Sequence, residues 1–201
     1  MALMQSEDAV IIVKNLVKDF NEVKAVAGIS FTVKAGEVLG LLGPNGAGKT
    51  TTIRILTGII KPSSGSVSIS NFDIEKEPIK AKQLLGIVPE MANAYMDLSA
   101  WQNLMLMGEL YGIQGEKCKK KANELLALFK LFEHKNKKVK FFSKGMKQRL
   151  IIAMALMNDT KILFLDEPTS GLDVESVRLI RQLITQLNQQ GMTILLTTHN
   201  L

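Results

Sequence analysis

The first part of the chain contains short segments in which apolar and β-branched residues dominate, separated by turns that contain glycine. Such a pattern predicts β-strands. We expect these strands at Val10–Val13, Val23–Val26, Ile29–Val33 and Glu37–Leu42. A glycine-rich loop follows, and an amphipathic stretch from Lys49 to Leu56 then predicts a helix. Two more strands are expected near Ser66–Ser70 and Leu84–Val88.

Strand patterns end near residue 88, and helical patterns replace them up to about residue 139. The elements expected from there on are helices at Ser99–Tyr111, Lys117–Leu131, Met146–Met157 and Val174–Gln190 and strands at Ile162–Leu165 and Thr193–Thr197. Strands that alternate with helices favour an α/β fold with a mostly parallel sheet. We therefore expect one folded unit, with a core at 1–88 and 140–201 and a helical subdomain at 89–139.

The composition is that of a globular protein that is soluble by itself. Of its 201 residues, 46% are hydrophobic and 22% are charged. No apolar run approaches the roughly 18 residues of a membrane-spanning helix. The N-terminus also lacks the basic and apolar pattern of a signal sequence. If the protein works at a membrane, another chain must supply the spans.

Cysteine content and charge bear on the compartment and the partners. The single cysteine, Cys118, excludes an internal disulfide and fits a reducing cytosol. Because lysines flank it, we expect an exposed thiol. The net charge of +6 makes nucleic acid a partner to consider. However, the clusters Lys117–Lys121 and Lys135–Lys140 are not interleaved with aromatic residues and are better interpreted as solvated faces, so we expect no nucleic acid partner.

A glycine-rich segment after Leu42 fits the phosphate-loop pattern of glycine, four residues and Gly-Lys-Ser/Thr. Its small residues let backbone N–H groups surround phosphates, Lys49 adds positive charge, and the Thr50 hydroxyl is a ligand for Mg²⁺. A structural turn without a ligand is the alternative, but the strand before it and the helix after it favour nucleotide binding. The expected nucleotide contacts are Gly43, Pro44, Asn45, Gly46, Ala47, Gly48, Lys49, Thr50 and Thr51.

The apolar strand expected at Ile162–Leu165 leads directly into two carboxylates, Asp166 and Glu167. Acids at the C-terminal edge of a buried strand lie where open α/β sheets bind their ligands. We interpret Asp166 as a Mg²⁺ ligand and Glu167 as the base that orients and deprotonates an attacking water. A strand end with exposed acids is the alternative, which the phosphate loop upstream disfavours.

Further motifs resemble those of ABC ATPases, in the family's order and over essentially the whole chain. Phe142–Leu150 resembles the signature motif, whose common form is Leu-Ser-Gly-Gly-Gln, and Pro168–Asp173 resembles the D-loop. Thr198-His199 resembles the switch histidine, and Phe20 lies where the family stacks an aromatic residue on adenine. The resemblance implies a P-loop NTPase core with an N-terminal antiparallel β subdomain and an inserted α-helical subdomain.

The resemblance also implies a motor that binds and hydrolyses ATP with Mg²⁺. Two cassettes would close head-to-tail over two ATP molecules, so that each nucleotide meets the signature of the opposite subunit. Asp173 would communicate across that interface. The implied signature set is Ser143, Lys144, Gly145 and Met146, and the implied catalytic set is Lys49, Glu167 and His199.

A second cassette and a transmembrane permease subunit are the implied partners, which places the chain in the cytoplasm at the inner face of the cell membrane. The motif style, with Glu90 and Ser-Lys-Gly-Met, leans toward an exporter. Soluble ABC ATPases of translation or DNA repair are the alternative. Repair ATPases replace the middle lobe with coiled coils or zinc insertions, and translation factors carry two cassettes on one chain; neither pattern occurs in this sequence. A P-loop kinase or switch would lack the signature, D-loop and histidine.

Glu90 and Lys144 depart from the family pattern. Glu90 replaces a glutamine that contacts Mg²⁺ and water, so we expect it to ligate Mg²⁺ and to alter the Mg²⁺ dependence of a retained ATPase. Lys144 replaces the first signature glycine, and its side chain either projects into solvent or adds a cation near the partner's phosphate. The chain stops at Leu201, whereas family members continue, so we expect a truncated C-terminus, a poorly anchored His199 and weak hydrolysis.

The segment after Glu90 is rich in methionine and aromatic residues. In transporters of this family, the same region forms the groove for a coupling helix of the membrane subunit, and such residues suit an adaptable apolar groove. Tyr95, Met96 and Trp101 are the candidates for this contact. Packing of the helix Ser99–Tyr111 is the alternative.

Overall fold

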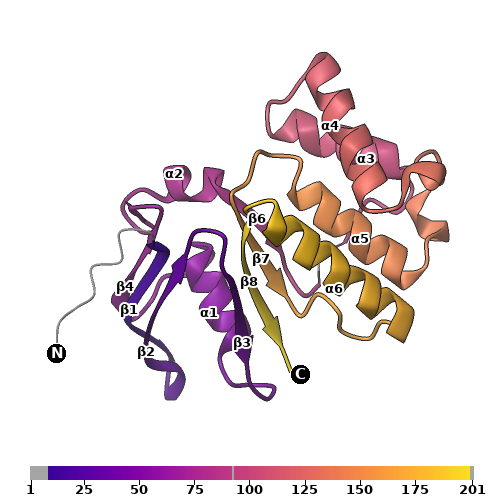
Figure 1. Cartoon of the computed structure of the whole chain (residues 1–201). Coiled ribbons are helices and arrows are strands. Elements are labelled where there is room, and N and C mark those ends of the chain that lie inside the picture. Colours follow the sequence, from indigo (N-terminus) through magenta and orange to yellow (C-terminus); the bar gives the residue numbers. More distant parts are fainter. Residues whose placement is uncertain (1–8, 92, 200–201) are drawn as a thin grey trace.

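Two four-stranded sheets and the helices around them make up the computed structural model, which describes residues 9–91 and 93–199 (Figure 1). One sheet is antiparallel, in the order β2-β1-β4-β5, and the other is parallel, in the order β3-β8-β7-β6. The α/β fold class, with a parallel core sheet, an N-terminal antiparallel sheet and inserted helices, is therefore confirmed.

The antiparallel sheet contains one long hairpin, formed by its first two strands. Its strands are β1 (Ala9–Phe20), β2 (Val23–Lys34), β4 (Ser64–Ile69) and β5 (Phe72–Asp73). β1 pairs with β2 on one side and with β4 on the other, so it is a central strand. Its side chains Ile11, Val13 and Leu16 are at most 2% exposed, because they face a core shared with α1 and the parallel sheet.

The parallel sheet brings together strands that lie far apart in the sequence. Its strands are β3 (Val38–Leu42), β6 (Leu85–Val88), β7 (Ile162–Asp166) and β8 (Thr193–Thr198). Every residue of β7 is buried, as expected for an inner strand covered on both faces. The pairing aligns Leu42 of β3 with Thr198 and Asp166 of β7 with Thr197. The carboxyl ends of these three strands therefore meet at one edge.

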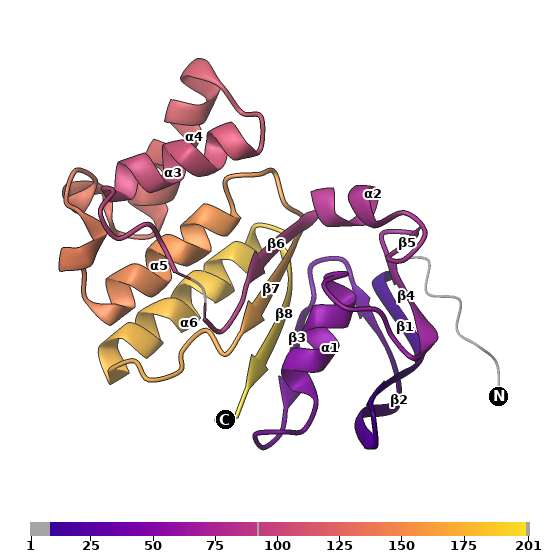
Figure 2. The ribbon, with the colours of Figure 1, turned by 180° about the vertical axis from the view of Figure 1, so that it is seen from behind.

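Helices cover both faces of the parallel sheet, as the two opposite views show (Figures 1 and 2). The helices are α1 (Lys49–Leu56), α2 (Pro78–Gln83), α5 (Lys144–Ala155) and α6 (Val174–Gln189). α1 packs between the two sheets, in one core with β1, β4 and Phe164 of β7. α5 and α6 pack on the other face of the parallel sheet. α2 links the sheets, because it connects β5 to β6.

The helical lobe lies outside both sheets (Figure 1). It contains α3 (Ala100–Leu110), α4 (Gly115–Leu128) and the short turns η1 (Phe132–His134) and η2 (Val139–Phe141). Ser99 caps α3 by accepting a hydrogen bond from the Gln102 N–H, while the Gln102 side chain accepts one from the Ser99 N–H. The buried Asn103 amide bonds the backbone N–H and C=O of Tyr95 and so ties the preceding segment to α3.

The expectation of an exposed Cys118 is wrong. The residue is fully buried, and its Sγ lies 3.7 Å from the sulfur of Met105. Cys118 shares the inner face of α4 with Ala122 and Leu126, at helical spacings of four residues, while the neighbouring lysines lie on other faces. Burial raises the pKa of the Cys118 thiol, so this cysteine is an unreactive core residue.

Across residues 9–91 and 93–199, none of the helices combines the length and the apolar character that crossing a bilayer requires.

Candidate functional site

A cleft of about 520 Å³ opens at the edge where β3, β7 and β8 end. Open α/β sheets bind their ligands at this edge. Residues from several separate segments line it: Ala25, Asn45, Gly46, Ala47, Gly48, Lys49, Thr50, Thr51, Glu90, Glu167, Ser170 and His199. The fold thus gathers most of the residues that the sequence assigns to nucleotide, metal and catalysis.

The loop of residues 43–48 connects β3 to α1 and forms one wall of the cleft. Gly48 has a φ of 82°, and a Cβ there would collide with the carbonyl oxygen of Ala25, so only glycine fits. Gly48 is also the N-cap of α1 and provides no side-chain acceptor. The first amide groups of α1 therefore remain available to an anion, which the helix dipole also favours.

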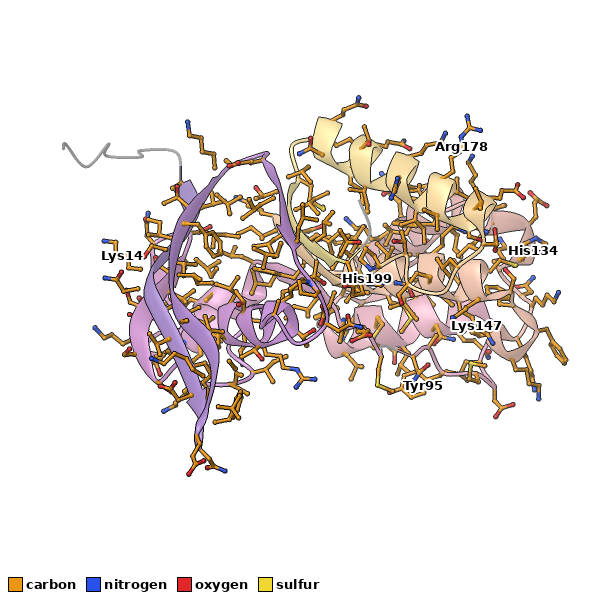
Figure 3. All side chains as sticks on the ribbon, turned by 90° about the horizontal axis from the view of Figure 1, so that it is seen from below. Lys14, Tyr95, His134, Lys147, Arg178 and His199 are labelled. Carbon is orange, nitrogen blue, oxygen red and sulfur yellow. The ribbon has the colours of Figure 1, made fainter. Side chains whose placement is uncertain are left out.

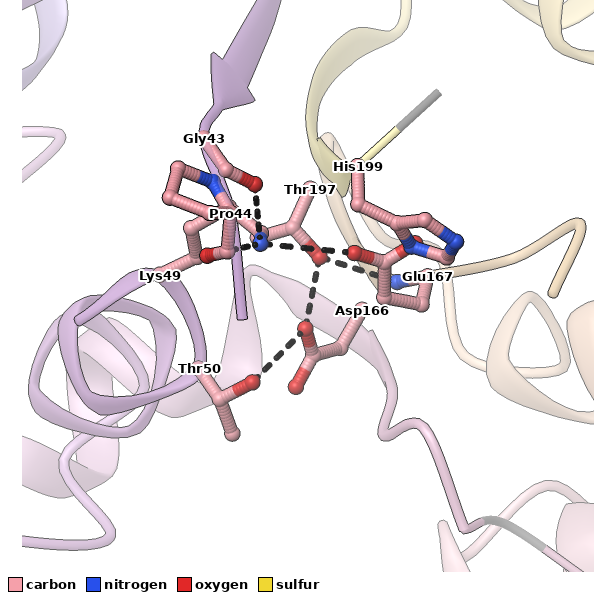
Figure 4. A network of polar contacts seen from close by, with 8 residues as sticks. All are labelled: Gly43, Pro44, Lys49, Thr50, Asp166, Glu167, Thr197 and His199. Carbon is pink, nitrogen blue, oxygen red and sulfur yellow. Dashed lines mark hydrogen bonds and ion pairs between the residues drawn. The ribbon is translucent and has the colours of Figure 1, made fainter. Parts of the chain in front are cut away.

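The backbone of this loop holds the side chain of Lys49 in place (Figure 4). Its Nζ donates hydrogen bonds to the carbonyl oxygens of Gly43, at 2.7 Å, and Pro44, at 3.1 Å. It also lies 3.6 Å from Oε1 of Glu167, and both side chains are only 8% exposed. Gly43 and Pro44 do not line the cleft, but their carbonyl groups hold the cation that does.

Asp166 lies beneath the cleft, 3% exposed, at the end of β7. Its Oδ1 accepts hydrogen bonds from the Thr50 hydroxyl, at 3.2 Å, and from the Thr197 hydroxyl, at 2.6 Å. Thr50 and Asp166 are thus adjacent hard oxygen donors, as the sequence predicts for Mg²⁺. No group of three or more His, Cys, Asp or Glu residues that could hold a metal occurs in the described segments. This donor set fits Mg²⁺, which binds few protein ligands and completes its shell with phosphates and water.

Glu167 has an unusual backbone conformation, with a φ of 49°. A non-glycine residue in this region costs about 1–3 kcal/mol and persists only where the surroundings enforce it. Its N–H donates to the Thr197 hydroxyl at 2.9 Å, and its Oε2 lies 2.8 Å from Nδ1 of His199. The carboxylate is thereby fixed between Lys49 and His199 (Figure 4). His199, expected to be poorly anchored, has this contact with Glu167.

The lining of the cleft differs from the sequence expectations at Phe20, Ala25 and Ser170. Phe20, the expected adenine platform, does not line the cleft; it ends β1, and Nζ of Lys18 lies 4.9 Å from its ring centroid. Ala25 and Ser170 both line the cleft. Ser170 belongs to the D-loop segment, but no local motif marks Ala25. Glu90 lines the cleft, as Glu167 does.

The signature residues lie at the N-terminus of α5 and do not line the chain's own cleft. Ser143 is the N-cap, and its hydroxyl accepts a hydrogen bond from the Met146 N–H at 3.2 Å. A Cβ on Gly145 would lie 2.7 Å from Cβ of Ser176, in the first turn of α6. The glycine is therefore required by the contact between the N-terminal ends of α5 and α6.

Lys144 is exposed. Its Nζ donates a hydrogen bond to the carbonyl oxygen of Gly171, 3.0 Å away, and so joins the signature to the D-loop of the same chain. Asp173, at the end of that loop, caps α6 by accepting bonds from the N–H and the hydroxyl of Ser176, each at 2.8 Å. The Ser176 backbone hydrogen bond lowers the pKa of Asp173, which keeps this carboxylate ionised.

A model of the family described as "ABC transporter" matches residues 26–170. The chain belongs to the ABC transporter family. Among similar proteins, the linearmycin resistance ATP-binding protein LnrL of Bacillus subtilis (strain 168) is 44% identical over 186 residues, 92% of this chain and 60% of LnrL. The Nod factor export ATP-binding protein I of Burkholderia lata is 41% identical, covering 92% of this chain and 61% of the relative.

The fold of this ABC cassette is also that of solved structures. The dimeric ATP-binding cassette MJ0796, bound to ADP and phosphate in a post-hydrolysis state, matches with a TM-score of 0.83 and 31% identity. The match covers 94% of this chain and 88% of that one. The family assignment from the motifs is therefore confirmed. The chain spans about 60% of the length of LnrL and of the Nod factor export protein.

Proposed function

We propose that this ABC cassette binds ATP and Mg²⁺ in the cleft and hydrolyses the bond to the terminal phosphate. The cycle of ATP binding and hydrolysis drives a membrane transporter. The observation that carries the proposal is the convergence of Lys49, Glu167 and His199 beside the Thr50–Asp166 pair (Figure 4). A cation, a base that orients water, and a hydroxyl–carboxylate pair for a metal are the groups that phosphoryl transfer to water uses.

Each residue has a role that its position supports. The amides of the loop and Lys49 bind the phosphates, and Thr50 and Asp166 hold Mg²⁺. Bound Mg²⁺ would neutralise the negative charge that develops on the phosphate oxygens. The Glu167 carboxylate orients the attacking water and accepts its proton, while His199, in contact with Oε2, keeps that carboxylate in place.

A second cassette is the proposed partner of the signature face. Ser143 is exposed at the N-terminus of α5, away from the chain's own cleft. A helix N-terminus favours anions, and the similar cassette MJ0796 forms a dimer. We infer that two copies, or this chain and a related one, close head-to-tail over ATP and reopen when hydrolysis removes the charge that joins them.

Replacing Glu167 by Gln tests the hydrolytic proposal. Gln keeps the shape of the side chain but accepts no proton, so phosphate release should fall at least about 100-fold while ATP still binds. The ATP-bound dimer should then accumulate, as measured by analytical ultracentrifugation. The same variant with ADP is the control and should stay monomeric. Unchanged turnover, or equal dimerisation with ADP, would contradict the proposal.

A membrane permease is the second proposed partner, and export is the proposed direction. The similar proteins named above are a resistance protein and a Nod factor export protein. Tyr95, 54% exposed, and Met96, 38% exposed, lie on the lobe, and Figure 3 shows Tyr95 at the periphery of the molecule. Trp101 instead packs against the core of the lobe, with Lys135 near its ring. Tyr95 and Met96 are therefore the proposed contacts, which would hold the chain at the cytoplasmic face of the membrane.

A soluble ABC ATPase of translation or DNA repair is the alternative function. The lysine clusters give it little support, because several of their members pair with acids of the same surface. The pairs are Lys117–Asp159, Lys119–Glu116, Lys121–Asp159 and Lys140–Asp97. Such paired, exposed lysines are typical of a solvated face and leave less positive charge for a polyanion.

Co-purification distinguishes these functions. The full-length protein, tagged and recovered from detergent-solubilised membranes, should bring a membrane protein with it. The double variant Tyr95→Ser and Met96→Ser should lose most of that partner, because it removes exposed apolar surface, yet should bind ATP as before. Tyr111→Ser, which alters another exposed aromatic residue of the lobe, is the matched control. Recovery of ribosomes or DNA instead would favour the soluble alternative.

Glu90→Gln tests the unusual acid in the cleft. A carboxylate binds Mg²⁺ more strongly than an amide does, so the variant should hydrolyse ATP but need more Mg²⁺ for half-maximal activity. The measurement is a Mg²⁺ titration of phosphate release at saturating ATP. An unchanged titration curve would show that Glu90 has no part in metal binding.

A further inference from the structure

Thr197 contacts both acids at the end of β7 through a single hydroxyl group. It is fully buried in β8, directly opposite Asp166 in the parallel ladder. Its Oγ1 donates to Oδ1 of Asp166 at 2.6 Å and accepts from the N–H of Glu167 at 2.9 Å (Figure 4). The hydroxyl thus uses its donor and an acceptor position at the same time.

The hydrogen bond to the Glu167 N–H occurs where the backbone leaves the strand conformation. Asp166 is the last residue of β7, and Glu167 has a φ of 49°. A strained residue of this kind needs surroundings that enforce its conformation. The Thr197 hydroxyl accepts the hydrogen bond of the Glu167 N–H and so fixes the backbone at this point. The backbone conformation in turn sets the direction of the Glu167 side chain.

The residue directly after β8, His199, contacts Glu167 at a second point. Thr197 and His199 are two residues apart, so an extended chain directs both to one side. Thr197 contacts the backbone of Glu167, and His199 contacts its carboxylate at 2.8 Å. β8 and the residue that follows it therefore contact both the backbone and the carboxylate of Glu167. Oδ1 of Asp166, which accepts from Thr197, also accepts from the Thr50 hydroxyl.

We propose that Thr197 is a positioning residue of the hydrolytic site, which holds the metal-side acid Asp166 and the water-side acid Glu167 in one fixed geometry. The inference rests on the proposed function. Thr197 does not line the cleft, so it acts through the two acids and not on the nucleotide. Its loss should lower kcat, since small misplacements of catalytic groups reduce rates strongly, and should leave ATP affinity nearly unchanged.

The hydroxyl can be removed without changing the volume of the side chain. Thr197→Val keeps the branched shape and leaves the partly buried Glu167 N–H without its acceptor, whereas Thr197→Ser keeps the hydroxyl. Thr193→Val is the matched control on the same strand. Thr193 is also buried, and its hydroxyl also accepts a backbone hydrogen bond, from Gly36 at 2.9 Å, but it lies at the opposite end of β8.

The experiment compares kcat, ATP affinity and thermal stability in the full-length protein. Thr197→Val should lower kcat by about 10- to 100-fold, with ATP affinity within about threefold of the wild type. Thr197→Ser should recover most of the rate, and Thr193→Val should lower stability without lowering kcat. In a Glu167→Gln background, Thr197→Val should cause little further loss, because the two residues act as one unit. Equal losses in both valine variants, or additive losses in the double variant, would overturn the proposal.

A second measurement keeps the inference separate from the proposed function. Hydrogen exchange of the Glu167 amide, followed by NMR without nucleotide, should be slow in the wild type and in Thr197→Ser and faster in Thr197→Val. This readout does not depend on turnover. If the wild type fails to hydrolyse ATP, the proposed function fails while the exchange rates still decide the role of Thr197. An amide that exchanges equally in all three proteins would overturn the positioning role.

Discussion

The parallel pairing of β7 with β8, and of β8 with β3, is the constraint on which the site depends. It sets Asp166 opposite Thr197 and Leu42 opposite Thr198, so the loop after β3, the acid after β7 and the histidine after β8 emerge at one edge. A slip of one residue in the pairing of β7 with β8 would turn each side chain of the shifted strand to the other face of the sheet. Asp166 would then lose Thr197, and Glu167 would lose its contacts with Lys49 and His199.

Much of this arrangement could be predicted from local patterns. The phosphate loop and the acidic strand end are contiguous motifs whose chemistry is readable without a structure, and the expected helix Lys49–Leu56 has the bounds of α1. The alternation of strands and helices predicts the parallel sheet, because a helix between two strands allows them to run in the same direction. These features depend on neighbours in the sequence, and for that reason the sequence alone was sufficient.

The remaining features depend on contacts between distant segments. The exposed thiol that the neighbouring lysines predict is wrong, because the helical spacing of Cys118 and Ala122 places both on the buried face of α4. The bond from Lys144 to Gly171 needs the packing of α5 on α6. The bonds of Thr197 with Asp166 and Glu167 need the register of β7 and β8. The left-handed backbone of Glu167 also has no local signal, because glutamate seldom adopts it.

The central claim is that the cleft binds nucleotide phosphates through Lys49 and the N-terminus of α1. Isothermal titration calorimetry of the full-length protein and of Lys49→Met, with ATP and Mg²⁺, tests this claim most directly. The variant removes the ammonium group but keeps an unbranched side chain, so its fold, checked by circular dichroism, should be unchanged. We predict that the wild type binds ATP and that the variant binds it at least about tenfold more weakly, the change that a charge-assisted hydrogen bond supports. Equal affinity in the two proteins, or a wild type that binds no ATP, would contradict the account.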